Sequence, residues 1–164
     1  MIKILRFLSK REIQQRQLAL GINSFISVED NLHIIMIDYD ILNITNVLES
    51  VNELTDFWNL GPYEVYSTKN GFHVFFWWTF VPFSRLKMIL DYCRYIDESY
   101  RYISRYYNYK TVRASGKYIT PDINFVGKFN GKITPSKDER ELGDLKRKEY
   151  IELKKIVFNK EHLK

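Results

Sequence analysis

Cysteine, proline and glycine are all scarce in this sequence, with 1, 4 and 7 of its 164 residues. The single cysteine, Cys93, excludes an intramolecular disulfide and a cysteine-rich zinc site, and it fits a reducing compartment. We find no low-complexity linker and no internal repeat. No apolar run approaches the ~20 residues of a membrane span, and basic residues interrupt the N-terminal apolar stretch, unlike in a signal peptide. We therefore expect a cytoplasmic protein without a membrane partner.

Apolar residues make up 45% of the chain and charged residues 27%, so we expect a single folded domain over 1–164. The charges are unevenly distributed. Residues 21–83 hold one Lys and eight Asp or Glu, whereas 84–118 hold eight Lys or Arg, three acids and eight of the 12 tyrosines. An acidic half beside a basic, aromatic half suits a metal-dependent enzyme that acts on a polyanion. Frequent Tyr and Lys in an A/T-rich genome would explain the pattern equally well.

Hydrophobic periodicity predicts an α+β fold, an RRM-like palm with an antiparallel sheet and helices packed on one face. The predicted helices are 9–20, 46–60, 84–107 and 137–158, and the predicted strands are 24–28, 33–39, the hairpin 63–78, 111–113 and 123–126. The last helix opens with a capping box at Ser136 and Glu139. We expect it to be a charged C-terminal appendage within 137–164. Its expected apolar seam is Leu142, Leu145, Leu153 and Val157.

The most informative stretch is an apolar run that ends in two carboxylates. Residues 33–37 predict a buried strand, and Asp38-Tyr39-Asp40 follow at once. Because side chains alternate along a strand, we expect Asp38 and Asp40 on one face, roughly 7 Å apart. A divalent cation would relieve the repulsion between two neighbouring carboxylates. We therefore predict a metal site at this pair, with a solvated strand end as the plainer interpretation.

The predicted hairpin follows, with Asn70-Gly71 between two strand-like runs. This dipeptide is a strong sequence signal for a tight turn between antiparallel strands. Ser67 precedes the turn and His73 follows it, so we expect these two side chains to lie opposite each other. A lone histidine on a strand is more often structural than functional, and both interpretations stay open for His73.

Together these residues resemble the first two motifs of the archaeo-eukaryotic primase (primase-polymerase) superfamily. A strand that ends in Asp-x-Asp precedes a Ser-x-Lys-x-Gly-x-His hairpin and an apolar strand. The sequence pattern Lys69-x-Gly71-x-His73-Val74 is similar to that of the polymerase domains of bacterial end-joining ligases. The likeness covers 33–78 well and extends more loosely to 112–117.

The resemblance implies a metal-dependent nucleotidyltransferase, a DNA primase or primase-polymerase of a virus, plasmid or mobile element. Such an enzyme joins nucleoside triphosphates to a 3′-hydroxyl on a single-stranded DNA template or primer, with Mg²⁺ or Mn²⁺ at the reacting phosphate. If it is viral, it would work in the cytoplasm of the host cell. The resemblance implies metal ligation by Asp38 and Asp40, and triphosphate contacts from Ser67 and His73. The expected cationic supports are Lys69, Arg113 and Lys117.

The resemblance also implies a third metal-binding carboxylate, in an apolar-Asp pair on a later strand. Asp122 and Asp97 are the candidates. We prefer Asp122, because it precedes a predicted strand that can return to the sheet edge beside Asp38. Asp97 lies within the predicted helix 84–107. The zinc-binding inserts and helical extension of larger primases are missing, so a replication helicase or a second subunit is an expected partner.

Two other function classes stay open. The basic, tyrosine-rich segment 84–118 suits a non-catalytic RRM-like module that binds nucleic acid. A metal-dependent nuclease could use Asp38 and Asp40. A rolling-circle initiator is disfavoured, because such enzymes need a His-hydrophobic-His pair. The three histidines here are isolated, at His33, His73 and His162.

Overall fold

The computed structural model describes residues 21–27, 29–103, 107–113 and 123–158, with the backbone alone at 103, 113 and 156–158. The strands are β1 (Gly21–Asn23), β2 (Phe25–Ser27), β3 (Leu32–Tyr39), β4 (Tyr63–Ser67), β5 (Phe72–Pro82), β6 (Thr111–Arg113) and β7 (Asn124–Phe129). The helices are α3 (Ile44–Trp58), α4 (Phe83–Tyr92), α5 (Glu98–Ile103) and α6 (Lys137–Phe158).

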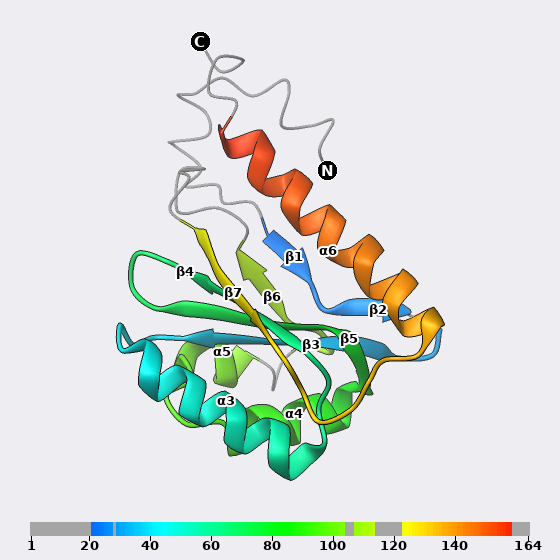
Figure 1. Cartoon of the computed structure of the whole chain (residues 1–164), viewed down its shortest axis with the longest axis horizontal. Coiled ribbons are helices and arrows are strands. Elements are labelled where there is room, and N and C mark those ends of the chain that lie inside the picture. Colours follow the sequence, from blue (N-terminus) through cyan, green and yellow to red (C-terminus); the bar gives the residue numbers. More distant parts are fainter. Residues whose placement is uncertain (1–20, 28, 104–106, 114–122, 159–164) are drawn as a thin grey trace.

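Five strands form one antiparallel sheet in the order β2-β3-β5-β4-β7, while β1 and β6 pair as a separate two-stranded sheet (Figure 1). The hairpin of β4 and β5 places β5 between β4 and β3. Helix α3 connects β3 to β4, and α4 follows β5 directly. This β–α–ββ–α order with an antiparallel sheet confirms the predicted α+β fold.

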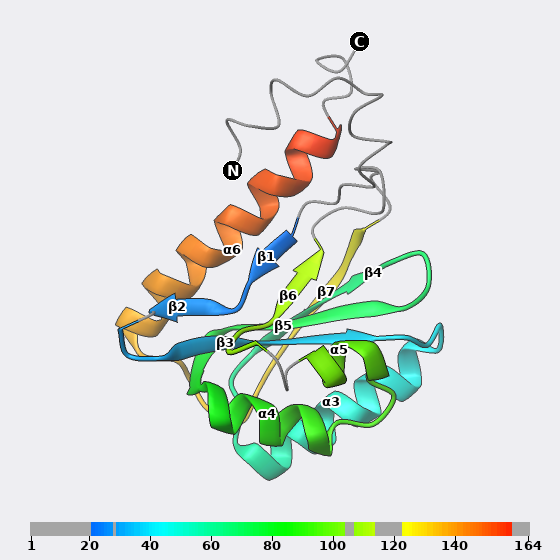
Figure 2. The same ribbon diagram turned by 180° about the vertical axis from the view of Figure 1, so that it is seen from behind.

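Helices cover both faces of the five-stranded sheet (Figures 1 and 2). Helices α3 and α4 lie on one face, as predicted, and the hydroxyl of Tyr63 on β4 donates to Asn52 Oδ1 on α3 at 3.1 Å. Helix α6 lies against the other face, where the ring centroid of Tyr150 is 4.7 Å from that of Phe75 on β5. The helix expected as an appendage is therefore a third layer of the fold.

The cover of helices on both faces of the sheet explains why β5 is apolar at nearly every position. Val74–Trp77 are fully buried, and so are Ile34–Ile37 on the neighbouring strand β3. An antiparallel strand with one face in water would alternate between apolar and polar residues. The continuous apolar run of β5 follows from burial on both faces, against α3 and α4 on one side and α6 on the other.

The predicted long helix 84–107 is wrong, because α4 ends at Tyr92 and a short connection separates it from α5. The backbone N–H of Cys93 donates to Ile89 and closes the last turn of α4. Tyr95 then takes a φ of 60°, the left-handed conformation, which turns the chain back toward β3. There Ile96 forms an antiparallel bridge with Tyr39.

Helix α6 begins with the predicted capping box. The N–H of Ser136 donates to Glu139 Oε2 at 2.8 Å, and the N–H of Glu139 donates to Ser136 Oγ at 3.2 Å. The predicted apolar seam is only partly right. Leu153 is buried, but Leu142 and Leu145 are 45% and 65% exposed.

The face that α6 presents to the sheet is set instead by Gly143 and Tyr150, both buried. A Cβ atom at Gly143 would lie 2.4 Å from the carbonyl oxygen of Trp77. Only glycine therefore allows α6 to approach β5 this closely.

Two other boundaries differ from the sequence prediction. Helix α3 begins at Ile44 rather than at residue 46. The side chain of Asn43 caps the helix by accepting hydrogen bonds from its first N–H groups. The predicted strand 24–28 corresponds to β2, and the short strand β1, which precedes it across Ser24, was not predicted. The predicted helix 9–20 lies outside the described residues. In the part of the chain that the structure describes, no helix has both the length and the apolar character to cross a membrane.

Candidate functional site

The strand register brings three polar residues into one row across β4, β5 and β3, near the end of the sheet where β3 stops. His73 on β5 pairs with Tyr66 on β4 and with Asp38 on β3. Cross-strand partners project from the same face, so this row faces α6. His73 Nε2 lies 3.5 Å from Asp38 Oδ1. The histidine is 1% exposed, while the side chain of Asp38 is 25% exposed and so remains open to solvent.

Asp97 extends this row on the far side of Asp38. The bridge between Tyr39 and Ile96 sets Asp97 opposite Asp38, and the N–H of Asp97 donates to the carbonyl oxygen of Asp38 at 2.8 Å. Asp97 Oδ1 accepts the N–H of Tyr100 at 3.0 Å and so caps α5. Asp97 was the second candidate for the third carboxylate, because its sequence context predicts a helix. Asp122, the preferred candidate, lies outside the described residues.

A buried cluster holds Asp97 in this place. The hydroxyl of Tyr100 donates to the carbonyl oxygen of Met36 at 2.8 Å, and Lys110 Nζ donates to the carbonyl oxygen of Tyr100. Burial raises the pKa of Tyr100, and the charge of Asp38 raises it further. Burial also lowers the pKa of Lys110 to about 8, although nearby Asp91 and Asp97 favour its charged form.

The hairpin between β4 and β5 packs against the end of β3. The prediction of a hairpin is confirmed, but its loop has four residues, 68–71, and neither Asn70 nor Gly71 has a positive φ. The N–H of Thr68 donates to the carbonyl oxygen of Gly71 at 2.8 Å. A Cβ atom at Gly71 would lie 1.8 Å from the carbonyl oxygen of Tyr39. Glycine is therefore required for the loop to lie beside the Asp38–Asp40 segment.

Ser67 does not lie opposite His73, contrary to the expectation. Ser67 pairs with Phe72, whereas His73 pairs with Tyr66. Since neighbouring residues of a strand point to opposite faces, Ser67 and His73 are on opposite faces of the sheet. The two residues thus do not form a joint triphosphate site in this structure.

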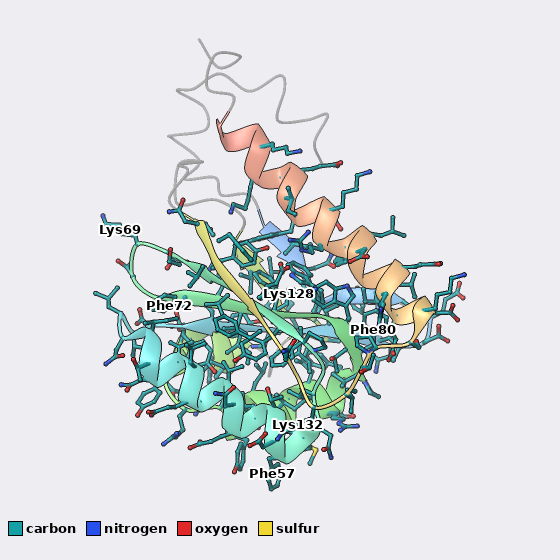
Figure 3. All side chains as sticks on the ribbon, viewed as in Figure 1. Phe57, Lys69, Phe72, Phe80, Lys128 and Lys132 are labelled. Carbon is teal, nitrogen blue, oxygen red and sulfur yellow. The ribbon has the colours of Figure 1, made fainter. Side chains whose placement is uncertain are left out.

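The remaining predicted residues are spread around this end of the sheet. Asp40 is exposed and lies one residue beyond β3. Lys69 is exposed at the tip of the β4–β5 hairpin (Figure 3). The backbone of Arg113 pairs with Gly21 between β6 and β1. Lys117 and the side chain of Arg113 lie outside the described part of the chain.

Asp38 and Asp97 are the two acidic residues that the backbone pairing sets opposite each other. Within the described ranges, no group of three or more His, Cys, Asp or Glu side chains could share one ion. Mg²⁺ is usually held by one or two carboxylates, with water and substrate phosphates completing its shell. Asp38 and Asp97 could supply such a pair, with Asp97 Oδ1 already accepting the N–H of Tyr100.

No family model, no curated protein and no solved structure matches this chain.

Sequence reasoning missed a buried carboxylate on the same face. Glu64 on β4 is 1% exposed, and it accepts hydrogen bonds from the Tyr66 hydroxyl at 2.7 Å and from Trp77 Nε1 at 3.0 Å. Arg147 Nε on α6 donates to both of its oxygens at 2.9 Å. Burial and the charge of Glu64 raise the pKa of Tyr66. The signal in the sequence was an acid inside the apolar run Tyr63–Tyr66.

Proposed function

We propose that this chain is a metal-dependent nucleotidyltransferase of the primase-polymerase type, which adds nucleotides to a 3′-hydroxyl of DNA. One observation carries the proposal, namely that Asp38 is flanked across the sheet by His73 and Asp97. These three residues come from three separate segments of the chain. Each segment matches one motif of the resemblance: Asp-x-Asp, Gly-x-His and apolar-Asp.

The chemistry needs a bound cation near the reacting phosphate. In the reaction, the 3′-hydroxyl attacks the α-phosphate of the incoming nucleotide and pyrophosphate leaves. Asp38 and Asp97 would hold the divalent ion, which would stabilise the charge that develops on the phosphate oxygens. Asp40, exposed just beyond the strand, is a further carboxylate at the same end of the sheet.

His73 acts on the carboxylate rather than on the nucleotide in this proposal. Its side chain is almost fully buried, and its Nε2 faces Asp38 Oδ1 at 3.5 Å. An imidazole in this place fixes the orientation of a metal-binding carboxylate. Lys69, exposed at the hairpin tip, is the cation with access to a bound triphosphate from that side.

The test is primer extension by the full chain on a single-stranded DNA template, with nucleoside triphosphates and Mn²⁺. Asp38→Asn and Asp97→Asn should each reduce incorporation at least about 100-fold, since each removes a charge at the reacting phosphate. Asp56→Asn is the matched control, because Asp56 is an exposed acid on α3, on the opposite side of the sheet. Full incorporation by both site variants would contradict the proposal.

Other outcomes separate the competing function classes. The wild type could bind DNA in a salt-dependent manner but neither incorporate nucleotides nor require a metal. This result would indicate a non-catalytic RRM-like binding module. Digestion of DNA in the absence of nucleotides would indicate a nuclease. Each of these results would overturn the proposed nucleotidyltransferase.

A further inference from the structure

Helix α6 places one lysine over the polar row of the sheet. Lys154 Nζ lies 4.9 Å from the centroid of the Tyr66 ring and 5.9 Å from that of Tyr150. Tyr66 is the cross-strand neighbour of His73, which in turn neighbours Asp38. The row therefore has a cation at one end and carboxylates at the other, about two strand spacings or roughly 10 Å apart.

Lys154 differs from the other cations that α6 directs toward the sheet. Arg147 is paired with Glu64 at 2.9 Å, and Lys146 is paired with Glu149 at 3.1 Å. No carboxylate of the described residues forms an ion pair with Lys154, although its side chain is half-buried. Burial lowers the pKa of this lysine. A half-buried cation without an acidic partner is incompletely solvated, and its charge is available to an anionic ligand.

We propose that Lys154 binds the polyphosphate chain of the nucleotide whose reacting phosphate lies at Asp38. This inference rests on the proposed function and adds a binding residue to the same site. The ammonium group is a compact charge with three donors, which suits phosphate oxygens. A chain of linked phosphates carries more negative charge than inorganic phosphate, so the ammonium group should bind tripolyphosphate more tightly even without a metal ion.

A purely structural role makes a different prediction. Lys154 could simply lay its aliphatic stem on Tyr66 and Tyr150, with its charge over the aromatic rings. Such cation–π contacts contribute to folding whether or not an anion is present. Lys154→Met retains the stem and removes the charge, so anion binding and folding stability separate the two roles.

The experiment is calorimetric titration of the full chain with tripolyphosphate, in buffer that contains EDTA. Lys154→Met should weaken binding at least about tenfold, because the charged contact is lost. Lys154→Arg should retain most of the affinity. Lys148→Met is the matched control, since Lys148 is an exposed lysine of the same helix, and its affinity should equal that of the wild type. Inorganic phosphate should bind more weakly than tripolyphosphate.

Three results would overturn the inference. The first is that the wild type does not bind tripolyphosphate, and the second is that Lys154→Met keeps the wild-type affinity. The third is that Lys148→Met loses as much affinity as Lys154→Met, which would indicate non-specific attraction. Circular dichroism shows whether Lys154→Met is folded, and Lys154→Gln replaces it in the titration if it is not. The titration contains no metal, so its outcome is independent of primer extension. Lys154-dependent binding without incorporation would contradict the proposed function alone.

Discussion

The two faces of the five-stranded sheet are built from alternate residues of the same strands, yet they differ in chemistry. The face toward α3 and α4 carries Ile35, Ile37 and Val74, all fully buried. Its polar contacts are few, such as the Tyr39 hydroxyl 3.2 Å from Ser50 Oγ.

The face toward α6 carries Asp38, His73 and Glu64, with Arg147 and Lys154 directed onto it from the helix. Charge is expensive to bury, so a fold that needed only stability would place it elsewhere. Under the proposed function, the α3–α4 face would provide stability and the α6 face would provide binding. Substitutions on the two faces should therefore have separable effects.

The largest effect on stability should come from the apolar face. Leu54→Ala removes a fully buried side chain of α3 and leaves a cavity, which should lower the free energy of unfolding by about 3–4 kcal/mol. Urea denaturation measures this change. If the variant is still folded under assay conditions, its affinity for tripolyphosphate should be unchanged. A large loss of affinity would show that the two faces are not independent.

Arg147→Met should affect both stability and binding. It leaves the carboxylate of Glu64 buried without its cation, at a cost of about 2–3 kcal/mol. This lies below the usual range for fully buried pairs, because the Arg147 side chain is 34% exposed. Lys132→Met is the control, since it breaks an exposed ion pair with Asp56 and should change stability by less than about 1 kcal/mol.

Since Glu64 anchors α6 beside Lys154, Arg147→Met should also weaken tripolyphosphate binding in the calorimetric titration. If the Arg147 and Lys132 variants were equally stable, the pair of Arg147 with buried Glu64 would not hold α6 on the sheet.

His73→Leu should have the smallest effect on stability, within about 1.5 kcal/mol, because leucine nearly conserves the volume of the buried imidazole. It removes the group that orients Asp38, so nucleotide incorporation should fall about 10–100-fold and the Mn²⁺ concentration for half-maximal activity should rise. Primer extension over a range of Mn²⁺ concentrations measures both. Unchanged activity would leave His73 with a packing role only.

The main elements of the fold were predictable because their signals are local. The apolar runs of β3 and β5, the spacing of α3 and the capping box of α6 each occupy a few neighbouring residues. The break between α4 and α5 was not predictable, since Leu86, Leu90, Cys93 and Tyr100 keep helical spacing across it and are buried on both sides. The break depends on the left-handed φ of Tyr95, a residue type that rarely adopts it.

The candidate site was predictable in part. Asp38, Gly71 and His73 belong to the sequence motifs, and the strand register brings these residues close together. The pairing of Ser67 was predicted wrongly, because the four-residue loop sets Ser67 opposite Phe72, whereas Ser67 would lie opposite His73 with a three-residue loop. Lys154 and Arg147 carry no local signal at all. Their positions follow from the approach of α6 to β5, which depends on Gly143 and on the acid Glu64 far away in the chain.

The contacts of α6 also bear on how the chain is made. Asp144 accepts the indole N–H of Trp78, 66 residues earlier, and Arg147 pairs with Glu64, 83 residues earlier. At about 5–20 residues per second, a ribosome needs several seconds to pass from β5 to α6. During this time one side of the aromatic strand β5 has no cover from α6. The burial of this face can therefore be completed only after α6 has been synthesised.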